Sequence, residues 1–555
     1  MGRVICIGLD GGTFDLIEPW MEAGYLPALR EIAEQGVSAR LRSVILPFTP
    51  QAWTSFMTGV NPGIHGIFGF KEMRKGDYGF QFVNNRSIRV KTLPRLLDEL
   101  KKRVISVNIP MTYPPDPLNG VIVAGMDAPG VESNFVYPLE MRERILEISP
   151  GYTVHLHIGA GYLDSDRKRR AGIRGLLDMV ENRERVVLHL LKEHPWDFFA
   201  VNFAATDQVQ HHFWRYLGGD GEFNDAILSV YRRVDAAVGR IRDRLDDQTS
   251  LIVMSDHGAG PASEWVFFID EWLREQGYLH FASRSPAKRL LSGTVRLGLN
   301  ALSRKLPSST KDRLMRRFPG LRTRSQGFIR RSLIDWSRTR VFSGEHPATL
   351  RINLRSREPH GIVNPGTEER QLRDRLISDL AELTIPTTGE RLVEGVYPKE
   401  ALYHGPYRDR APDLMVLTAG LGHQIRGGPY PAGLAYDQTI CRKNPHEFFV
   451  NGVHRLHGLF MAAGPHVVSR ADPDGPFSIM DLCPTVFFMM GLDVPLGLDG
   501  RVLEGIFDKD HLRENPVKYR DYDLTRTGEA REKSYDRMED AQKIETVLRG
   551  LGYLD

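Results

Sequence analysis

Short apolar runs recur along the chain, each bounded by residues that favour turns. The first, RVICIGL, fills residues 3–9 and ends in Asp10-Gly11-Gly12. Runs of this length that are rich in Val, Ile and Phe and closed by Gly or Asp predict buried β-strands. We predict further strands at residues 104–108, 120–124, 198–203, 250–254, 414–417 and 458–465.

Segments with apolar residues at helical spacing lie between these strands. They predict helices at residues 27–34, 92–101, 172–193 and 225–244. Strands and helices that alternate at this spacing are typical of a mostly parallel sheet covered by helices on both faces. We therefore predict a doubly wound α/β fold, in which the chemistry gathers beyond the carboxyl ends of the strands.

The pattern changes after residue 280. Between Phe281 and Arg331 there are 14 lysines and arginines and one acidic residue, Asp312, among Leu, Val and Phe at helical spacing. This predicts basic amphipathic helices, which we interpret as a cap at residues 281–338 inserted into a catalytic core. The core then comprises residues 1–280 and 339–508, and residues 509–555 form a C-terminal extension. A chain of 555 residues is long enough for this division.

The basic segment has more than one interpretation. Charge runs are commonly solvated faces, so the simplest is a cap whose arginines pair with the acidic remainder of the chain. The apolar residues at helical spacing keep an anionic membrane surface as a candidate partner. Nucleic acid is a weaker candidate.

Composition narrows the class of protein. A hydrophobic fraction of 41% and a charged fraction of 26% are those of a globular protein. The three cysteines, Cys6, Cys441 and Cys483, are too far apart for a metal finger or a disulfide framework. No apolar stretch has the ~18 residues that a membrane span needs, and the first strand leaves no room for a signal peptide. We therefore expect a cytoplasmic protein.

Ionisable residues gather at four strand ends. They are Asp10, the pair Asp207 and His211, the pair Asp256 and His257, and His454. An Asp and a His four residues apart lie on one face of a helix, and Gly258 permits a turn that lets the adjacent pair converge. Mixed carboxylate and imidazole ligands suit Zn²⁺, Mn²⁺ or Fe. Each signal alone is also typical of a helix cap, a surface pair or a satisfied histidine, but their combination on this fold favours a metal site.

The chain resembles the alkaline phosphatase superfamily, specifically its type I phosphodiesterase/nucleotide pyrophosphatase branch. The resemblance depends on GLDGG, TPQAWTSFMTGVNPGIHGI at residues 49–67, TDQVQHHFW, SDHG and GVHRLHGLFMAAGP. These motifs extend from Asp10 to Pro465 and exclude the basic segment and the tail.

The resemblance implies a role for each matching residue. Asp10, Asp256 and His257 match the ligands of one metal ion, and Asp207, His211 and His454 match those of a second. Thr49 matches the nucleophile, whose oxygen also binds the first ion. Two divalent ions, Zn²⁺ or else Mn²⁺ or Fe, would then support hydrolysis of a phosphodiester, pyrophosphate or phosphonate ester through a phospho-threonine intermediate.

One position departs from the family pattern, and the choice of one histidine ligand stays open. The pattern usually has a proline two residues after the nucleophile, where this chain has Gln51. His457 is an alternative to His454 as a ligand, although the distance from His454 to the following strand fits the superfamily better.

Related reactions stay open to different degrees. A sulfatase is disfavoured because no Cys or Ser with the required arginine occupies the Thr49 position. A phosphomutase of the superfamily uses serine, so Thr49 argues mildly against it. A phosphomonoesterase needs additional positive charge at the site. The motifs contain no group that supplies this charge, which favours a small-molecule diester or phosphonate substrate. Neither the natural substrate nor the oligomeric state follows from the sequence.

Overall fold

A computed structural model describes most of the chain. The described residues are 2–74, 76–156, 165–282, 334–427, 439–442, 450–469, 476–526, 535 and 538–550. The basic segment predicted at 281–338 lies almost wholly outside them, so its helical character stays a prediction. The domain boundaries at 280, 338 and 508 also stay predictions.

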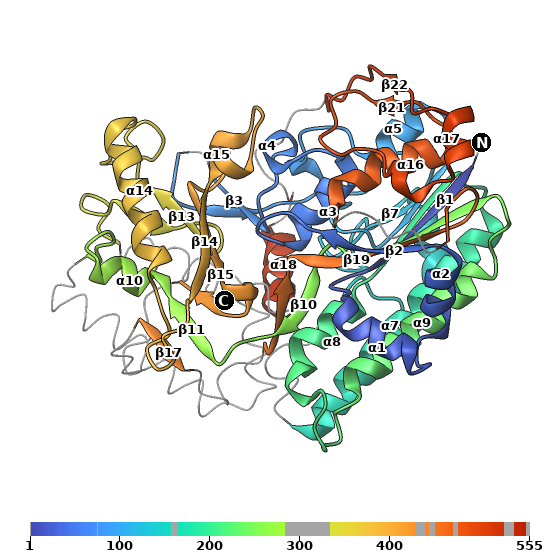
Figure 1. Cartoon of the computed structure of the whole chain (residues 1–555), viewed down its shortest axis with the longest axis horizontal. Helices are drawn as coiled ribbons and strands as arrows, with labels where there is room; N and C mark the ends of the chain where they lie inside the picture. Colours follow the sequence, from blue (N-terminus) through green and yellow to red (C-terminus); the bar gives the residue numbers. More distant parts are fainter. Residues whose placement is uncertain are drawn as a thin grey trace.

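A nine-stranded sheet forms the centre of the larger lobe (Figure 1). Its strands in spatial order are β20 (Phe477–Ser478), β2 (Val37–Arg42), β19 (His457–Ala463), β9 (Thr249–Met254), β1 (Arg3–Leu9), β8 (Phe198–Phe203), β5 (Val104–Val107), β6 (Gly120–Val123) and β7 (Val136–Tyr137). The run from β9 to β6 is parallel, whereas β19 lies antiparallel between β2 and β9. The sheet is therefore mostly parallel, as predicted.

Alternate residues of β1 face two different hydrophobic cores. Ile5 and Ile7 pack into one core, while Val4 and Cys6 pack into the other. Successive side chains of a strand point to opposite faces, so a strand covered on both faces is apolar throughout. Cys6 is a buried free thiol, as is Cys483.

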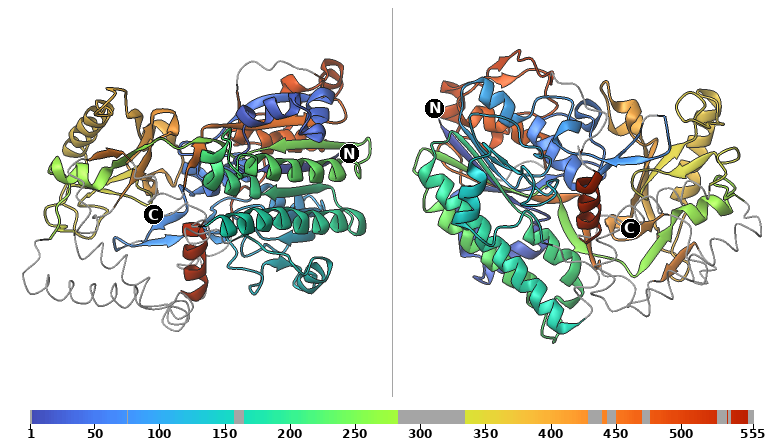
Figure 2. Two further views of the ribbon diagram at one scale, coloured as in Figure 1. Left: turned by 90° about the horizontal axis from the view of Figure 1, so that it is seen from below. Right: turned by 180° about the vertical axis from the view of Figure 1, so that it is seen from behind.

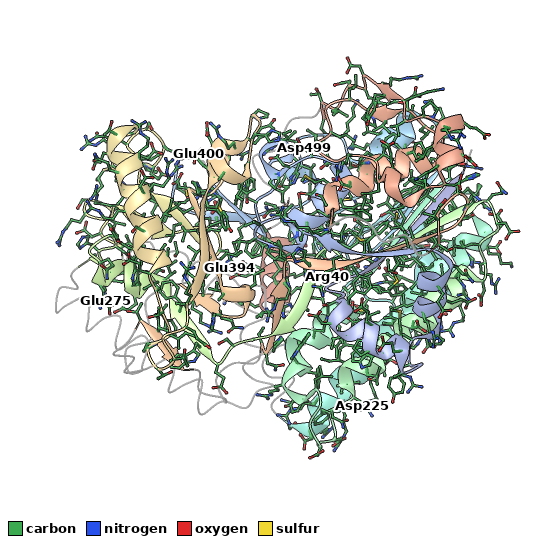
Figure 3. All side chains as sticks on the ribbon, in the orientation of Figure 1. Arg40, Asp225, Glu275, Glu394, Glu400 and Asp499 are labelled. Atoms are coloured by element: carbon green, nitrogen blue, oxygen red, sulfur yellow. The ribbon has the colours of Figure 1, made fainter. Side chains whose placement is uncertain are left out.

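Helices cover both faces of this sheet (Figure 2). Those that contribute to the first core are α1 (Phe14–Glu22), α2 (Pro27–Gln35), α6 (Met141–Ile148), α7 (Asp166–Glu193), α8 (Ala205–Phe213) and α9 (Ala226–Arg242). Those of the second core are α3 (Thr49–Thr58), α5 (Leu93–Glu99) and α16 (Leu482–Met489). Charged side chains such as Asp225 and Glu275 lie on the outside of the molecule (Figure 3).

A smaller lobe has its own hydrophobic core. Its four-stranded sheet has the order β12 (Val341–Ser343), β13 (Thr349–Ile352), β15 (Leu414–Thr418) and β14 (Val393–Pro398). Three further strands, β16 (Gln424–Arg426), β11 (Trp265–Phe268) and β17 (Ile440–Arg442), form a second sheet. Helices α10 (Ile269–Glu275) and α14 (Thr367–Ala381) contribute to the same core.

Ten further short helices and strands are described. They are α4 (Pro62–His65), β3 (Lys71–Met73), β4 (Phe80–Phe82), β10 (Gly258–Pro261), α15 (Lys399–Leu402), β18 (Gly452–Arg455), β21 (Val494–Pro495), α17 (Lys509–Glu514), β22 (Tyr519–Arg520) and α18 (Met538–Gly550). Helix α18 lies between the lobes in the views of Figures 1 and 2.

The predicted strand at residues 414–417 exists but belongs to the smaller lobe. It pairs antiparallel with β13 and β14, and not within the central sheet. An apolar run shows that a strand is buried on both faces, but it carries no information about which strands flank it.

The longest helix, α7, has 28 residues and begins with the charged sequence DRKRR. In the part of the chain that the structure describes, no helix combines the length and the apolar character needed to cross a membrane.

Candidate metal centre

The carboxyl ends of three adjacent strands supply most of the predicted ligands. In the sheet β1 lies between β8 and β9, with Leu9 in register with Phe203 and Gly8 in register with Met254. Asp10 therefore follows β1 at the same sheet edge where α8 begins after β8 and where Asp256 and His257 follow β9. Parallel neighbours bring residues that are distant in sequence to one edge, which is why the strand-end motifs converge.

The last predicted ligand reaches this edge through a short antiparallel pair. Strand β18 pairs with β10, and His454 is in register with Ala259, two residues after His257. The rings of His257 and His454 stack with centroids 3.5 Å apart. The predicted residues thus form two adjoining groups.

Each group has three side chains whose ligand atoms lie within 4.8 Å of one another. The first ligand group comprises Asp10, Asp256 and His257, and the second comprises Asp207, His211 and His454. All are buried except His454, which is partly buried.

The three histidines present the same ring nitrogen to the carboxylates. His211 Nδ1 lies 2.8 Å from the Gly452 carbonyl, His454 Nδ1 2.8 Å from the Pro47 carbonyl, and His257 Nδ1 3.0 Å from the Gly258 carbonyl. A carbonyl only accepts, so Nδ1 carries the proton and Nε2 offers its lone pair to the group. Backbone carbonyls thus set the tautomer that metal ligation requires.

The Nε2 atoms lie close to the aspartates of their own group. In the second ligand group, Asp207 Oδ1 is 3.3 Å from His211 Nε2 and 3.5 Å from His454 Nε2. In the first, His257 Nε2 is 3.4 Å from Asp256 Oδ2 and 3.8 Å from Asp10 Oδ1.

Burial and mutual repulsion disfavour the charged forms of the first ligand group. Burial and, to a smaller extent, the Asp207 charge raise the pKa of Asp10 to about 7, against a 2.8 Å hydrogen bond from Asn202 Nδ2. Burial raises the pKa of Asp256 well above its usual range, with Asp10 and Asp207 contributing. Burial also lowers the pKa of His257 well below its usual range. Buried carboxylates this close need positive charge between them to ionise together.

Several buried polar atoms support a cation in this place. Among the described residues, no hydrogen bond reaches Asp10 Oδ1, Asp256 Oδ2, His257 Nε2 or Thr49 Oγ. Buried polar atoms are nearly always paired, so the three atoms of the first ligand group that find no partner among the described residues fit metal ligands better than a structural network. Carboxylate and imidazole donors are also the set that Zn²⁺ accepts.

Thr49 is the first residue of helix α3 and is fully buried. The carbonyl of Pro47, two residues earlier, accepts the hydrogen bond from His454, which ties this loop to the second ligand group. The other hydroxyls of the segment are engaged: Thr54 and Thr58 donate to helix carbonyls, and Ser55 Oγ lies 3.0 Å from His65 Nε2. All three residues lie inside α3, and the two threonine hydroxyls bond to carbonyls one turn earlier in the helix.

The His457 side chain is in neither ligand group. It is on β19 opposite Arg42, and burial together with Arg40 and Arg42 lowers its pKa. Of the two histidines that the sequence left open, the structure brings His454 into the group.

Gln51, which stands where a proline was expected, connects three segments. Its Nε2 donates to the Ile45 carbonyl at 3.2 Å and to Tyr403 Oη at 3.2 Å, and Tyr403 Oη donates to the same carbonyl at 2.7 Å. Tyr403 belongs to the smaller lobe's core, so Gln51 links the start of α3 to that lobe.

Sequence reasoning missed two residues beside the centre. His346, in the loop between β12 and β13, packs against Phe48 with centroids 4.6 Å apart. Burial, with Lys71 and His454 nearby, lowers the pKa of His346 to about 3. Asn202, which holds Asp10, had a signal in the sequence, since it is the one polar residue in the buried run FFAVNF. No feature of the sequence indicated His346, because its neighbours are determined by the packing of the two lobes.

Comparisons with known proteins agree with the motifs. The model of the type I phosphodiesterase/nucleotide pyrophosphatase family matches residues 4–448. No curated protein matches the sequence.

Solved structures share the fold at low sequence identity. Human ectonucleotide pyrophosphatase/phosphodiesterase 5 superposes with a TM-score of 0.50 at 13% identity, covering 91% of this chain and 100% of its own. An inactive variant of the murine protein, in complex with AMP, superposes with a TM-score of 0.50 at 12% identity, and the match covers 92% of this chain and 100% of the murine one. Phosphonoacetate hydrolase from Sinorhizobium meliloti 1021 with phosphonoacetate gives 0.49 at 15% identity, covering 88% and 95%.

Proposed function

The chain belongs to the type I phosphodiesterase/nucleotide pyrophosphatase family, a family of phosphorus-ester hydrolases, and we propose that it cleaves phosphodiester, pyrophosphate or phosphonate esters with Thr49 as nucleophile. One observation carries the proposal. Thr49, whose buried hydroxyl has no hydrogen-bond partner among the described residues, begins a helix whose preceding loop accepts a hydrogen bond from His454.

The two ligand groups would each hold one divalent cation, for which Zn²⁺ is the best match to the donors. Bound there, the cations would neutralise charge on the phosphoryl oxygens and lower the pKa of the hydroxyl. Asp10, Asp256 and His257 would hold one ion, and Asp207, His211 and His454 the other. The carbonyls of Gly452, Pro47 and Gly258 would keep each imidazole oriented.

Thr49 Oγ would attack phosphorus, and the bond from phosphorus to the leaving group would break. The resulting ester on Thr49 would lie at the N-terminus of α3, a ten-residue helix whose free amides favour a phosphoryl oxygen. Water would then cleave this phospho-threonine and restore the hydroxyl. The murine structural neighbour binds AMP, so nucleotide diesters belong among the substrates to be tested.

A substrate panel tests the reaction class. Nitrophenyl phosphate monoesters, diesters and phosphonates are assayed with Zn²⁺ and with Mn²⁺, and kcat/KM is compared. We expect diesters or phosphonates to exceed monoesters. A higher value for monoesters would favour the alternative, a phosphomonoesterase or phosphomutase of the same superfamily.

Thr49→Ala tests the nucleophile. We expect turnover to fall by at least ~10³-fold with metal content nearly unchanged, because every aspartate and histidine ligand stays in place. Thr58→Ala is the matched control, since that hydroxyl lies in the same helix and donates to the Thr54 carbonyl. Full activity of Thr49→Ala would remove Thr49 from the mechanism.

A further inference from the structure

The C-terminal helix α18 packs in a small hydrophobic cluster that adjoins the cores of both lobes through Tyr113 and Phe48. The buried members of this cluster are Phe70, Tyr535, Ile544 and Leu548, with Phe48, Phe82, Tyr113, Met126 and Ala541 against them. Tyr535 fixes the segment, because its Oη donates to the Asp127 carbonyl at 2.8 Å and its ring stacks on Tyr113 at 6.0 Å. In Figures 1 and 2 the helix lies between the lobes.

Phe48 packs against the cluster and Pro50 lines an adjoining cavity, so both neighbours of Thr49 in the sequence are involved. The Phe48 ring is 6.5 Å from that of Phe70, and Phe48 packs against the cluster. Pro50 lines a cavity whose wall includes Ile544 and Leu548. Helix α18, almost five hundred residues later in the chain, therefore lines a cavity together with the residue that follows the proposed nucleophile.

The cavity is small and mainly apolar. Its volume is about 20 Å³, and its lining comprises Pro50, Phe70, Val83, Pro110, Met111, Met126, Asp127, Tyr535, Ile544 and Leu548. The Asp127 carboxylate accepts hydrogen bonds from the Met111 and Tyr113 amides, so these bonds occupy both of its oxygens. A space of this size holds one group as large as a water molecule, and an apolar lining favours an apolar one.

We propose, on the basis of Thr49 as the nucleophile, that this cavity receives a small apolar substituent of the phosphorus ester. Ile544 and Leu548 of α18 then limit the size of that substituent and act as specificity-determining residues. This segment lies beyond residue 448, where the match to the family ends. Substrate selection would therefore depend on a part of the chain that the family pattern does not include.

A series of nitrophenyl alkylphosphonates from methyl to butyl tests the proposal. We expect the unmodified enzyme to prefer methyl. Leu548→Ala enlarges the cavity and should raise the butyl-to-methyl ratio of kcat/KM roughly tenfold or more. Ile544→Phe fills the cavity and should lower the ethyl-to-methyl ratio of kcat/KM. Thr546→Ala, an exposed position of the same helix, should leave both ratios unchanged.

Binding separates this proposal from the assignment of the nucleophile. The same phosphonates are titrated by calorimetry into Thr49→Ala, with and without Leu548→Ala. We expect Leu548→Ala to tighten butyl relative to methyl in Kd as well. Unchanged ratios in both assays, with both α18 variants folded by circular dichroism, would overturn the role of α18. Shifted ratios together with full activity of Thr49→Ala would overturn only the proposed nucleophile.

Discussion

At the residue scale, the candidate metal centre depends on which nitrogen of each imidazole is protonated. Backbone carbonyls hold Nδ1–H in His211, His257 and His454, so the Nε2 atoms are the ones that face the two ligand groups. A ring that was free to turn would lose this preference, and its affinity for a cation would fall. The backbone is therefore part of the metal site, although it supplies no ligand.

Removing a ligand should cost both metal and activity. In Asp256→Asn or His257→Ala we expect the metal content to fall from about two ions per chain to about one or fewer. We expect kcat/KM to fall by roughly 10³-fold, since each ion contributes several kcal/mol to transition-state stabilisation. Elemental analysis of the purified protein and the diester assay measure both quantities. His457→Ala is the control and should keep metal and activity, and full metal occupancy in both ligand variants would refute the assignment.

His65 should make stability depend on pH. The Ile67 amide donates to His65 Nδ1 at 3.2 Å, so Nε2 carries the proton and donates to Ser55 Oγ. Burial lowers the pKa of this neutral ring to about 3, against about 6.5 in the unfolded chain. Below pH 6.5 the unfolded state binds the extra proton, so this contribution is complete above pH 6.5 and is lost as the pH falls toward 3.

Chemical denaturation of the unmodified protein and of His65→Asn between pH 7.5 and 4 measures this effect. The difference in unfolding free energy between the two should shrink by up to about 1.4 kcal/mol per pH unit below pH 6.5. A difference that stays constant across this range would mean that His65 is not held neutral.

The site residues differ in how far sequence could predict them. Asp10, Asp207 and Asp256 follow apolar runs, and adjacency of parallel strands is enough to bring them together. His454 was placed by resemblance, because its local sequence equally fits a satisfied polar residue. His346 could not be predicted, since its position depends on how the two lobes pack.

At the element scale, helix α3 ends at a left-handed residue. Gly59 has φ 66°, and its amide donates to the Ser55 carbonyl to close the helix. A Cβ at this position would lie 3.1 Å from Cys483 Cβ and 3.2 Å from a Leu498 methyl group. The end of the helix that carries Thr49 thus has both a conformational and a packing constraint.

Gly59→Ala should lower the free energy of unfolding by about 1–2 kcal/mol from backbone strain, with a further cost from the contact with Cys483. Gly24→Ala is the matched control, because Gly24 has φ 77° and nothing lies within 4 Å of its Cβ position. Denaturant titration of both variants separates the two costs. Equal losses would show that the Cys483 contact adds nothing.

The sequence predicted the positions of helices and strands better than it predicted which strands pair with each other. The strands at residues 3–9 and 198–203 match their predicted bounds, and the helix at 27–34 differs by one residue. The strand predicted at 414–417 exists, but it pairs in the sheet of the smaller lobe and not in the central sheet. Local periodicity determines burial and element type, whereas pairing is decided by segments far away in sequence.

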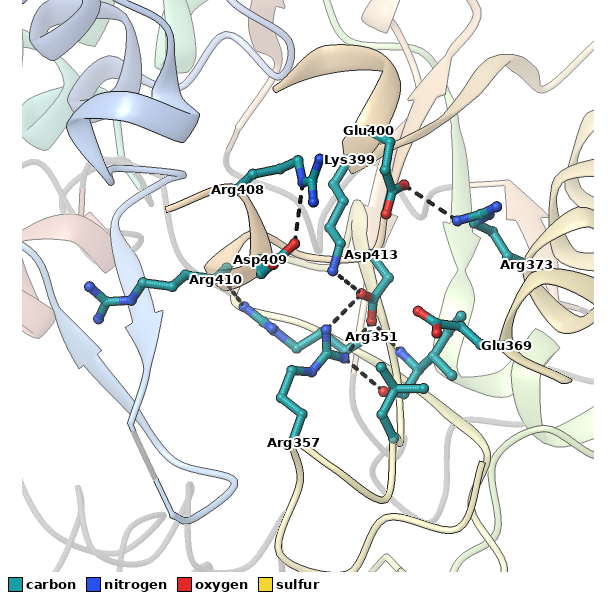
Figure 4. Close-up of polar contacts among 12 residues, drawn as sticks. Arg351, Arg357, Glu369, Arg373, Lys399, Glu400, Arg408, Asp409, Arg410 and Asp413 are labelled. Atoms are coloured by element: carbon teal, nitrogen blue, oxygen red, sulfur yellow. Dashed lines mark hydrogen bonds and ion pairs between the residues drawn. The ribbon is translucent and has the colours of Figure 1, made fainter. Parts of the chain in front are cut away.

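At the scale of the whole molecule, a buried ion network holds the smaller lobe together (Figure 4). Asp413 Oδ2 is 2.6 Å from Arg357 Nη2, and Asp413 Oδ1 is 3.0 Å from Lys399 Nζ. Although burial alone would raise it, the pKa of Asp413 is held far below its usual range by Arg357 and Lys399. The carboxylate also accepts the Ile352 amide, so it joins β13 to β15.

Asp413→Asn should destabilise the protein by about 3–5 kcal/mol, because the buried Lys399 loses its counter-charge and the partly buried Arg357 keeps only Glu358. Asp409→Asn, four residues earlier, removes a carboxylate that pairs with Arg408 on the surface and should cost under ~1 kcal/mol. Thermal unfolding of the two variants gives the comparison. Similar Tm values would show that the network does not stabilise the lobe.

The position of β19 affects how the chain is made. This strand separates β2 from β9, yet it is synthesised roughly two hundred residues after β9. At the usual pace of translation the ribosome needs about 10–40 s to cover that distance. Throughout this interval β2 and β9 each present an open edge to which another chain can add. Newly made protein therefore needs shielding by chaperones until β19 emerges, and a chain that stops short of residue 457 should aggregate instead of folding.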